Sequence, residues 1–253
     1  MIINIKKIES HLLQQLLITG EMSEVINNIR WQKYINTSLT TLGIATAKQR
    51  QLAKLGFTEM SQLPFETKVE IFGKLFKESQ IFEIKNQCLY FLDLNKQKKL
   101  GIEHWPLIKE WVNFVDNWAH SDGLSSVFSL VMQYHLDDLY QQLLLWNKSK
   151  NKWERRQSVV CLFYYSKTRK EFLPFEQSSN LILNLLNDKE YYVQKGIGWA
   201  LRESSNIYYD YTYDFILQHL HQLKPAAYSA AIEKLMPNHK EQIRLLRKKK
   251  STF

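Results

Sequence analysis

The sequence predicts an all-α protein built from stacked antiparallel helix pairs. The chain of 253 residues contains only 8 glycines and 5 prolines, too few turn residues for a β-sandwich or a barrel. Apolar residues recur at helical spacing along most of its length. The brief alternation over residues 208–213 is too short and too isolated to form a sheet.

A few residues mark the boundaries of the predicted helices. Gly20 ends the first helix, and Thr46 is the expected N-cap of a helix that ends at Gly56. Pro64 takes the first position of the next helix. The basic segment 244–250 is expected to fray. The predicted helices cover residues 2–20, 22–38, 46–56, 64–77, 79–95, 103–116, 117–133, 137–147, 152–167, 173–187, 189–205, 210–222 and 225–236.

The helices recur in pairs. The second helix of a pair begins near Asp116, Lys152 and Lys189, and this spacing of roughly 36–40 residues is within the range of HEAT-type repeats. Each pair buries its apolar face against its neighbours, so we expect a HEAT-like superhelix, an α-α solenoid with a concave basic groove. Residues 1–240 are expected to form one repeat domain, and residues 241–253 a basic C-terminal tail.

The net charge of +9 favours a polyanionic partner. Nucleic acid is the first candidate, because a concave basic surface suits duplex DNA. An anionic membrane surface is the second. A third interpretation is that the lysines and arginines are only solvated surface, and charge alone leaves it open.

The two cysteines, Cys88 and Cys161, both lie in apolar runs and are expected to be buried in a reducing compartment. No metal-binding pattern is present, so we expect no metal and no cofactor. We recognise no signal peptide, and no apolar run approaches the length of a membrane span. The sequence therefore predicts a cytoplasmic, monomeric protein.

Trp118 and Asp122 form the first candidate site. Four residues apart on a helix, they share one face about one turn apart. Taken alone, this pair has a plain explanation, with Trp118 in the core and Asp122 as a cap or turn residue.

The helix predicted over residues 189–205 carries the second candidate site. Tyr192, Lys195, Trp199 and Arg202 fall outside its apolar stripe, which is unusual for core residues. Gly196 and Gly198 lie among them. Two interpretations remain open for these glycines: a ligand approaches the backbone there, or another helix packs closely.

Several segments together resemble the bacterial DNA alkylation repair family, the AlkD-like DNA glycosylases. The most specific is Val193-Gln-Lys-Gly-Ile-Gly-Trp-Ala-Leu-Arg-Glu203. The others, in the same order and spacing as in the family, are Tyr34, Leu42-Gly-Ile-Ala-Thr46, Arg50, Asn117-Trp-Ala-His-Ser-Asp122, and Trp153 with Arg156. The resemblance covers roughly residues 31–236. It implies a HEAT-like fold, a bacterial cytosolic or nucleoid location, and excision of alkylated purines from duplex DNA in base excision repair.

The chain departs from the family pattern at three places. Ala119 stands where the family has its first acid, and Ala47 stands where it has a proline. The segment Tyr228-Ser-Ala230 replaces an Arg-Arg-Glu cluster. These departures bear on rate and substrate range more than on the fold.

The resemblance also implies roles for individual residues. An N3- or N7-alkylated purine is a cationic leaving group, and the transition state is oxocarbenium-like. Asp122 is the expected catalytic carboxylate, and Trp118 and Trp199 are expected to flank the nucleotide. The expected DNA contacts are Tyr34, Arg50, Arg156, Lys195 and Arg202. The alternative hypothesis is a catalytically degenerate HEAT-like module that binds DNA or protein without chemistry.

Overall fold

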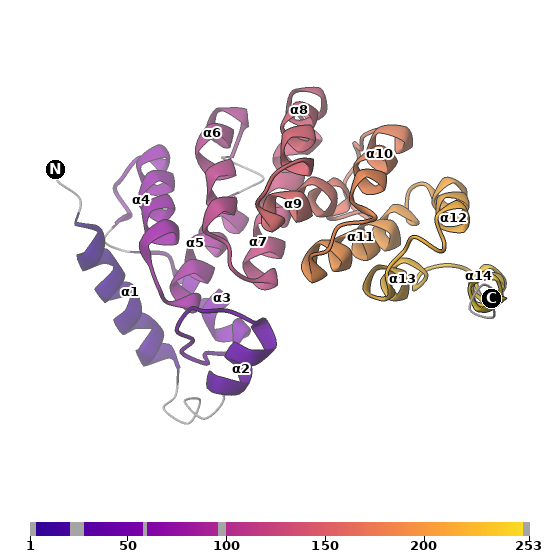
Figure 1. The fold of residues 1–253 in the computed structure, drawn as a ribbon. Coiled ribbons are helices and arrows are strands. Elements are labelled where there is room, and N and C mark those ends of the chain that lie inside the picture. The colour runs from indigo at the N-terminus through magenta and orange to yellow at the C-terminus, as the bar shows by residue number, and fades with distance from the viewer. Residues whose placement is uncertain (1–3, 21–27, 58–59, 96–99, 250–253) are drawn as a thin grey trace. The chain divides into compact units, whose positions relative to one another are not determined.

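The computed structural model describes residues 4–20, 28–57, 60–95 and 100–249 (Figure 1). Within these ranges the protein is all-α, and its one β-bridge joins Thr40 to Ile81. The predicted fold class is therefore confirmed. Residues 21–27, where the helix predicted over 22–38 was to begin, lie outside the described residues, as does Lys250 of the basic segment. The chain divides into two compact units, residues 1–127 and 128–253.

Helix α5 is the central packing element of the first unit. Helices α3 and α4 both pack on α5, α1 packs on all three, and α4 also packs on the short turns that follow α5. Its elements are α1 (Ile5–Thr19), α2 (Asn28–Ile35), α3 (Thr46–Leu55), α4 (Phe65–Glu78), α5 (Phe82–Asn95), η3 (Ile102–His104), α6 (Trp105–Ile108), η4 (Lys109–Phe114) and the first turns of α7 (Trp118–Gln133).

The second unit is a two-layer stack of helices. Helices α9, α11 and α13 pack on one another in that order, while α8, α10 and α12 each pack on a member of that row (Figure 1). After the end of α7, its elements are α8 (Leu136–Asn147), α9 (Lys152–Phe163), α10 (Phe175–Leu185), α11 (Tyr191–Ser204), α12 (Tyr209–Gln218), α13 (Pro225–Ala231) and α14 (Pro237–Lys249).

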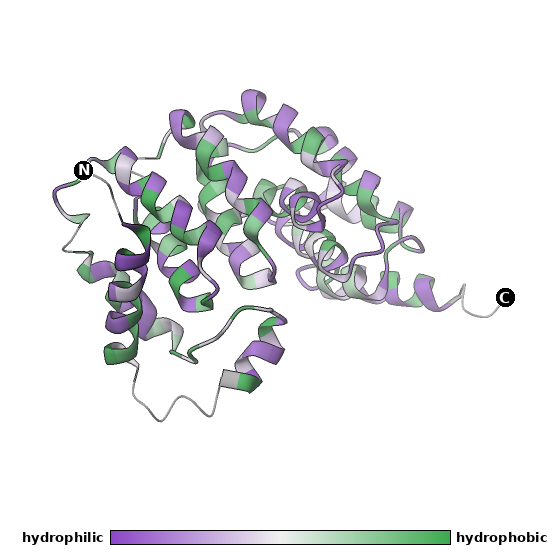
Figure 2. Cartoon of the chain, turned by 60° about the vertical axis from the view of Figure 1, so that its left-hand side comes forward, coloured by the Kyte–Doolittle hydropathy of each residue, from purple (hydrophilic) through white to green (hydrophobic). Residues whose placement is uncertain are grey.

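The helices form because their apolar residues repeat at helical spacing, and hydrophobic and hydrophilic residues lie on different sides of many of them (Figure 2). In α4, for example, Val69, Phe72 and Phe76 are fully buried at spacings of three and four residues. The paired helices predicted to begin near Asp116, Lys152 and Lys189 are α7, α9 and α11.

Two predicted helices differ clearly from the structure. The helix predicted over 103–116 is instead one α-turn between two 3-10 turns. Its buried residues Trp105, Ile108 and Trp111 recur every three residues, which is the period of a 3-10 helix. The helix predicted from residue 79 begins at Phe82, because the backbone on either side of Ile81 is hydrogen-bonded to Thr40.

Two caps and the C-terminal end also differ from prediction. The N-cap of α3 is Ala45, not Thr46, and it makes no side-chain capping bond. Glu83 of α5 instead accepts hydrogen bonds from the backbone N–H groups of Leu42 and Gly43, just before α3. Pro64 is the N-cap of α4 and not its first residue. The basic residues through Lys249, expected to fray, form part of α14.

The side chain of Arg169, which is buried, caps the C-terminal end of helix α9. Arg169 donates hydrogen bonds to the carbonyl oxygens of Cys161 (3.2 Å), Leu162 (2.5 Å) and Ser129 (3.1 Å). It therefore satisfies carbonyl groups that a helix end leaves without partners. Burial lowers the pKa of Arg169 to about 10, so it stays charged at neutral pH. No helix among the described residues is long and apolar enough to cross a membrane.

Candidate functional site

The start of α7 is held by a network around Asp116. One carboxylate oxygen accepts hydrogen bonds from the hydroxyl of Thr37 (2.7 Å) and the backbone N–H of Ser38 (2.8 Å). The side-chain amide of Asn117 donates to the other oxygen (2.7 Å). Burial raises the pKa of Asp116, but these hydrogen bonds outweigh burial and hold its pKa below the ordinary value. Asp116 is therefore a carboxylate that ties the segment after α2 to the start of α7.

His120 is fully buried in the first turn of α7. Its Nδ1 lies 2.9 Å from the amide nitrogen of Asn117, and its Nε2 lies 3.3 Å from the carbonyl oxygen of Phe82. These partners assign the proton to Nε2, since the carbonyl can only accept. Burial, together with the charge of Lys85, lowers the pKa of His120 to about 3. His120 is therefore neutral and structural, and it is inaccessible as a proton donor to a ligand.

Trp118 and Asp122 lie on consecutive turns of α7, and both are partly exposed. The ring of Trp118 meets Tyr34 edge-on, with centroids 5.5 Å apart, and its indole N–H donates to the Tyr34 carbonyl oxygen at 3.4 Å. Tyr34 also stacks on Trp31, with centroids 5.4 Å apart, and is 62% exposed. The structure thus brings together two predicted site residues, Trp118 and Tyr34, in one partly exposed aromatic cluster.

Ala119, which stands at the position of the family's first acid, packs on an apolar cluster. That cluster consists of Ile35, Leu39 and Phe82, with Trp31 beside it. A carboxylate at position 119 would have to share this apolar surface, at a cost in desolvation. Alanine at this position therefore suits the packing between α2, α5 and α7.

Arg50, a predicted DNA contact on α3, lies against α5. Its guanidinium lies 3.8 Å from the carboxylate of Asp93 and 4.9 Å from the centre of the Tyr90 ring. Asp93 also accepts a hydrogen bond from the hydroxyl of Ser126 on α7. The Arg50 side chain is 57% exposed, so its charge remains open to solvent while its position is fixed by α5.

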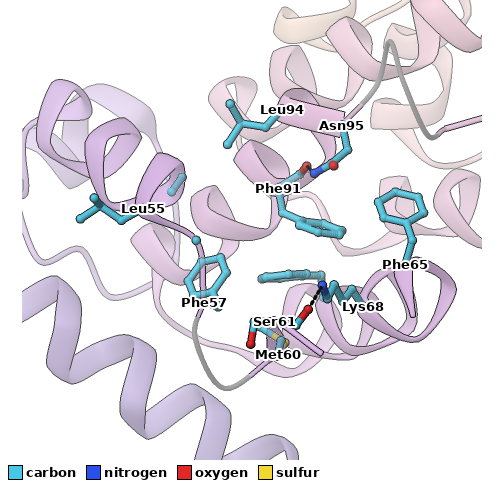
Figure 3. Close-up of a pocket in the computed structure, with 12 residues that line it drawn as sticks. Leu55, Phe57, Met60, Ser61, Phe65, Lys68, Phe91, Leu94 and Asn95 are labelled. Atoms are coloured by element: carbon cyan, nitrogen blue, oxygen red, sulfur yellow. Dashed lines mark hydrogen bonds between the residues drawn. The ribbon is translucent and has the colours of Figure 1, made fainter. Parts of the chain in front are cut away.

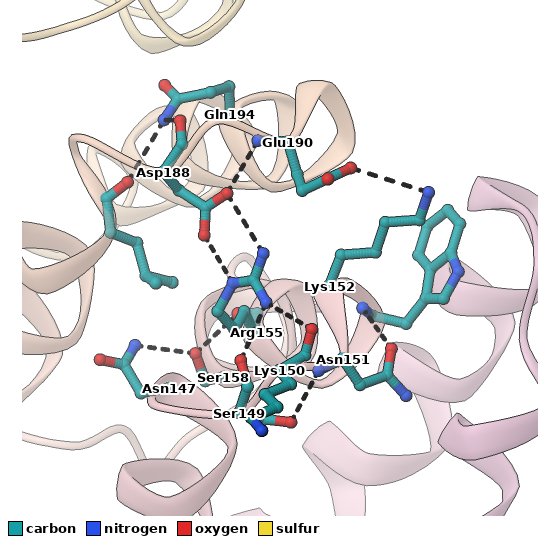
Figure 4. Close-up of polar contacts among 12 residues, drawn as sticks. Asn147, Ser149, Lys150, Asn151, Lys152, Arg155, Ser158, Asp188, Glu190 and Gln194 are labelled. Atoms are coloured by element: carbon teal, nitrogen blue, oxygen red, sulfur yellow. Dashed lines mark hydrogen bonds and ion pairs between the residues drawn. The ribbon is translucent and has the colours of Figure 1, made fainter.

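In the second unit, polar contacts join the start of α9 to the start of α11 (Figure 4). Arg155 forms an ion pair with Asp188 and donates to the carbonyl oxygen of Ser149 (2.8 Å). Gln194 donates to the carbonyl oxygens of Leu185 (3.2 Å), Leu186 (3.1 Å) and Asp188 (2.9 Å). Sequence reasoning missed Arg155 and Asp188; their spacing of about one repeat is the signal that would have paired them.

Arg156, a predicted phosphate contact, is only 5% exposed. Its Nη1 donates to the carbonyl oxygen of Tyr192 at 2.7 Å. Trp153, also buried, stacks on the Tyr192 ring with centroids 5.3 Å apart. Trp153 and Arg156 therefore hold the first turn of α11 against α9. A direct phosphate contact by Arg156 stays a prediction.

Trp199 lies on α11 and is partly exposed. Its ring stacks on Tyr164, with centroids 5.3 Å apart, and the guanidinium of Arg202 lies 5.9 Å from its centre. Arg202 also pairs with Glu203 (3.0 Å) and Glu233 (3.1 Å), so its charge is already balanced by carboxylates. Lys195 is exposed on the same helix.

The two glycines of α11 are explained by close packing. A Cβ at Gly198 would come within 2.3 Å of the carbonyl oxygen of Ala227 and 2.8 Å of its Cα, both of them backbone atoms of α13. A Cβ at Gly196 would lie 3.2 Å from side-chain atoms of Arg156 and Val160 on α9. The neighbours at both positions are helices of the same unit, which favours the packing interpretation over ligand approach.

A cavity of about 300 Å³ lies between α3, α4 and α5 (Figure 3). Aromatic rings line it, and those of Phe72 and Phe91 stack with centroids 4.2 Å apart. At its edge Lys68 donates to the carbonyl oxygen of Ser61 (3.1 Å). None of the predicted site residues lines this cavity, so it is separate from the candidate site.

Tyr228, in the segment that replaces the family's Arg-Arg-Glu cluster, packs under a cation from another helix. The guanidinium of Arg247 on α14 lies 3.9 Å from the centre of the Tyr228 ring. This segment therefore contributes to anchoring α14.

Comparisons with known proteins agree with this architecture. The family model for the DNA alkylation repair enzyme matches residues 21–235. A comparison with curated proteins gives no match. Among solved structures, the chain is similar to a predicted DNA alkylation repair enzyme from Enterococcus faecalis, with 18% identity, a TM-score of 0.70, and coverage of 83% of this chain and 95% of that one.

A second similar structure is AlkD2 from Streptococcus mutans, with 17% identity and a TM-score of 0.52. It covers 82% of this chain and 96% of its own. At these identities the structures establish likeness of fold. The family model spans well over half of the chain, and on that ground the protein belongs to the DNA alkylation repair enzyme family.

Proposed function

We propose that this protein is a DNA glycosylase. Its substrates are positively charged purines of the 3-methyladenine or 7-methylguanine type in duplex DNA, and its reaction is a step of base excision repair. The observation that supports this most is the pair Trp118 and Asp122, a partly exposed aromatic ring and a partly exposed carboxylate on consecutive turns of α7. A further support is membership of the DNA alkylation repair enzyme family.

The proposed chemistry needs one carboxylate. When the bond between the base and the sugar C1′ breaks, its electron pair returns to the base and neutralises the positive charge there. Positive charge then develops on the sugar. Asp122 stabilises this charge and orients the water that adds to C1′, and the carboxylate accepts the proton that the water releases. A cationic base leaves without a proton from an acid, so a second carboxylate at position 119 is not required.

The tryptophans supply aromatic faces for the cationic nucleotide. A cation over the face of an indole ring is stabilised by about 0.5–2 kcal/mol. Trp118 is positioned for this role by Tyr34, and Trp199 by Tyr164. Since both rings are partly exposed, they retain surface for such a contact.

The proposed phosphate contacts differ in how readily they reach a ligand. Lys195, Arg50 and Tyr34 are exposed, so they reach DNA without rearrangement. Arg202 has carboxylate partners at 3.0 and 3.1 Å, and a phosphate must compete with them. We therefore expect Lys195 and Arg50 to contribute more to the electrostatic part of DNA binding than Arg202.

Substitution of Asp122 tests the mechanism. We expect Asp122→Asn to slow release of alkylated base by about 100-fold or more, because the amide keeps the shape and loses the charge. The measurement is base release from methylated duplex DNA under single-turnover conditions, with DNA affinity measured in parallel. Asp138→Asn on α8, whose side chain is 75% exposed, is the matched control. Release by Asp122→Asn at the wild-type rate would show that the mechanism is wrong.

A second function is favoured by the surroundings of Ala119. The family's first acid is absent, and its position packs on apolar residues. Under this alternative, the chain is a catalytically degenerate member of the family that binds DNA or protein without chemistry. Wild-type protein that binds methylated DNA and releases no base would support this alternative.

A further inference from the structure

Helix α14 lies beyond residue 235, where the match to the family model ends. It belongs to the second unit (labelled α14 in Figure 1), and side-chain contacts anchor one of its faces there. Ile243 is fully buried, and the hydroxyl of Tyr213 on α12 donates to the side chain of Gln242 at 2.9 Å. Arg247 donates to the carbonyl oxygens of Leu220 (2.9 Å) and Leu223 (2.8 Å). These contacts hold α14 in one orientation against α12 and the turn that follows it.

Another face of α14 carries a row of cations, which we name the cation stripe: Lys240, Arg244 and Lys248. These residues are four apart, so they succeed one another at about 6 Å along the helix axis. Together with Pro237, Glu241 and Leu245 they line a shallow surface hollow. The cation stripe therefore presents three positive charges in a line on a rigid support.

The charges of the stripe are largely uncompensated. In the described part of the chain, Arg244 and Lys248 are exposed and make no hydrogen bond or ion pair, while Lys240 donates to the carbonyl oxygen of Glu233 at 3.0 Å. Glu241 is the one acid in α14, beside five lysines and arginines. Such a surface attracts a polyanion.

Duplex DNA fits this surface better than a membrane does. A helix that lies in a membrane interface needs a wide apolar face turned to the lipid. In α14 the central apolar residue, Ile243, is buried inside the protein, and Leu245 and Leu246 alone are exposed apolar residues of this helix among those described. A line of cations on a folded support, in contrast, suits the phosphates of a DNA strand.

We propose that the cation stripe of α14 binds the phosphate backbone of duplex DNA outside the catalytic residues. This inference rests on the proposed function, because it takes DNA as the substrate. The stripe makes the protein's affinity for DNA higher without touching the base that is released. Its contribution is independent of sequence and falls with salt.

The test is a double substitution, Arg244→Gln with Lys248→Gln, in the full chain. Binding to an unmodified duplex is measured by fluorescence anisotropy from 50 to 200 mM salt. Each lost phosphate contact lowers the slope of log affinity against log salt by about 0.9, so we expect a loss of about 1.8. The matched control, Lys6→Gln with Lys7→Gln, removes two exposed cations from α1 and leaves the slope unchanged. Both variants should melt at the wild-type temperature.

The outcomes separate this proposal from the proposed function. A reduced slope for the α14 variant, with base release at saturating DNA unchanged, supports the stripe. A reduced slope supports it also when the wild-type protein releases no base, a result that overturns only the glycosylase activity. An unchanged slope and affinity overturn the stripe, whatever the activity. Binding of the wild-type protein, and not of the α14 variant, to phosphatidylserine vesicles with unchanged DNA affinity overturns it in favour of a membrane.

Discussion

At the scale of single residues, Gly198 sets the distance between two helices. Helix α11 approaches the backbone of α13 at this position so closely that a Cβ would lie 2.3 Å from the carbonyl oxygen of Ala227. Backbone atoms of a helix cannot move aside as a side chain can. Gly196, two residues earlier, faces only side-chain atoms at 3.2 Å.

These two glycines give a paired prediction. We expect Gly198→Ala to lower the free energy of unfolding by about 2 kcal/mol or more, because α13 must shift away from α11. Gly196→Ala should be close to neutral, since the slight displacement of Arg156 and Val160 is offset by up to about 1 kcal/mol of helix propensity. Chemical denaturation of both variants measures the difference. Equal stability of the two variants would contradict this account of α11.

Residue roles were only partly predictable from the sequence. The pairing of Trp118 with Tyr34 could not be derived, because it joins residues 84 positions apart. The burial of Arg156 was missed as well. Arginine is almost never fully buried without partners, and one partner of Arg156 is the backbone carbonyl of Tyr192, a contact that leaves no mark in the sequence.

At the scale of elements, Asp116 connects α7 to the segment after α2. Its carboxylate accepts hydrogen bonds from four donors: the backbone N–H and the hydroxyl of Ser38, the hydroxyl of Thr37 and the side-chain amide of Asn117. An amide at position 116 would place an N–H₂ group opposite one of these donors. Thr37 and Ser38 lie three and four residues after Tyr34, so this connection holds the segment after α2 against the start of α7.

We therefore expect Asp116→Asn to lower the free energy of unfolding by about 1–3 kcal/mol at neutral pH. Because the pKa of Asp116 is lowered in the folded protein, its contribution is fully present above the ordinary value of 3.8 and is lost as the pH falls through the folded pKa. The difference between the variant and the wild type should shrink below pH 3.8. Denaturation series at pH 7, 5 and 3 measure it. Asp137→Asn, exposed on α8, is the control, and a difference independent of pH would contradict the argument.

Most helices were predictable from periodicity, whereas several of their ends were not. Helix α5 starts late because Thr40 pairs with the backbone on either side of Ile81, a contact between distant segments. The segment 244–250 was expected to fray because it is so basic, yet it belongs to α14 as far as Lys249. Its order comes from contacts such as Tyr213 with Gln242, which the local sequence does not reveal.

At the scale of the whole molecule, the proposed catalytic residues come from both units. Asp122 and Trp118 belong to the first, and Trp199 belongs to the second. The sequence predicted one repeat domain over residues 1–240, and the repeat spacing placed these residues on different helix pairs. The net charge of +9 also belongs to this scale, since it favours a polyanionic partner without saying which surface binds it.

A double-mutant cycle tests whether Trp118 and Trp199 act on the same nucleotide, as proposed. We expect Trp118→Ala and Trp199→Ala each to slow base release. The fold-reduction in the double variant should differ from the product of the two single fold-reductions, because the two rings contact one nucleotide. Single-turnover release from methylated duplex DNA supplies the four rates. Strict multiplication of the two effects would indicate that the tryptophans work independently.

The two cysteines have a practical consequence for studies of this protein. Cys88 lies on α5 in the first unit and Cys161 on α9 in the second, and both are fully buried. Burial raises the pKa of both thiols, that of Cys161 to about 12, so neither reacts with a thiol reagent while the surrounding helices stay closed. Each unit thus carries its own internal reporter. The rates at which a thiol reagent labels Cys88 and Cys161, measured by peptide mass analysis, report the opening of each unit separately. The measurement needs no substitution in the protein.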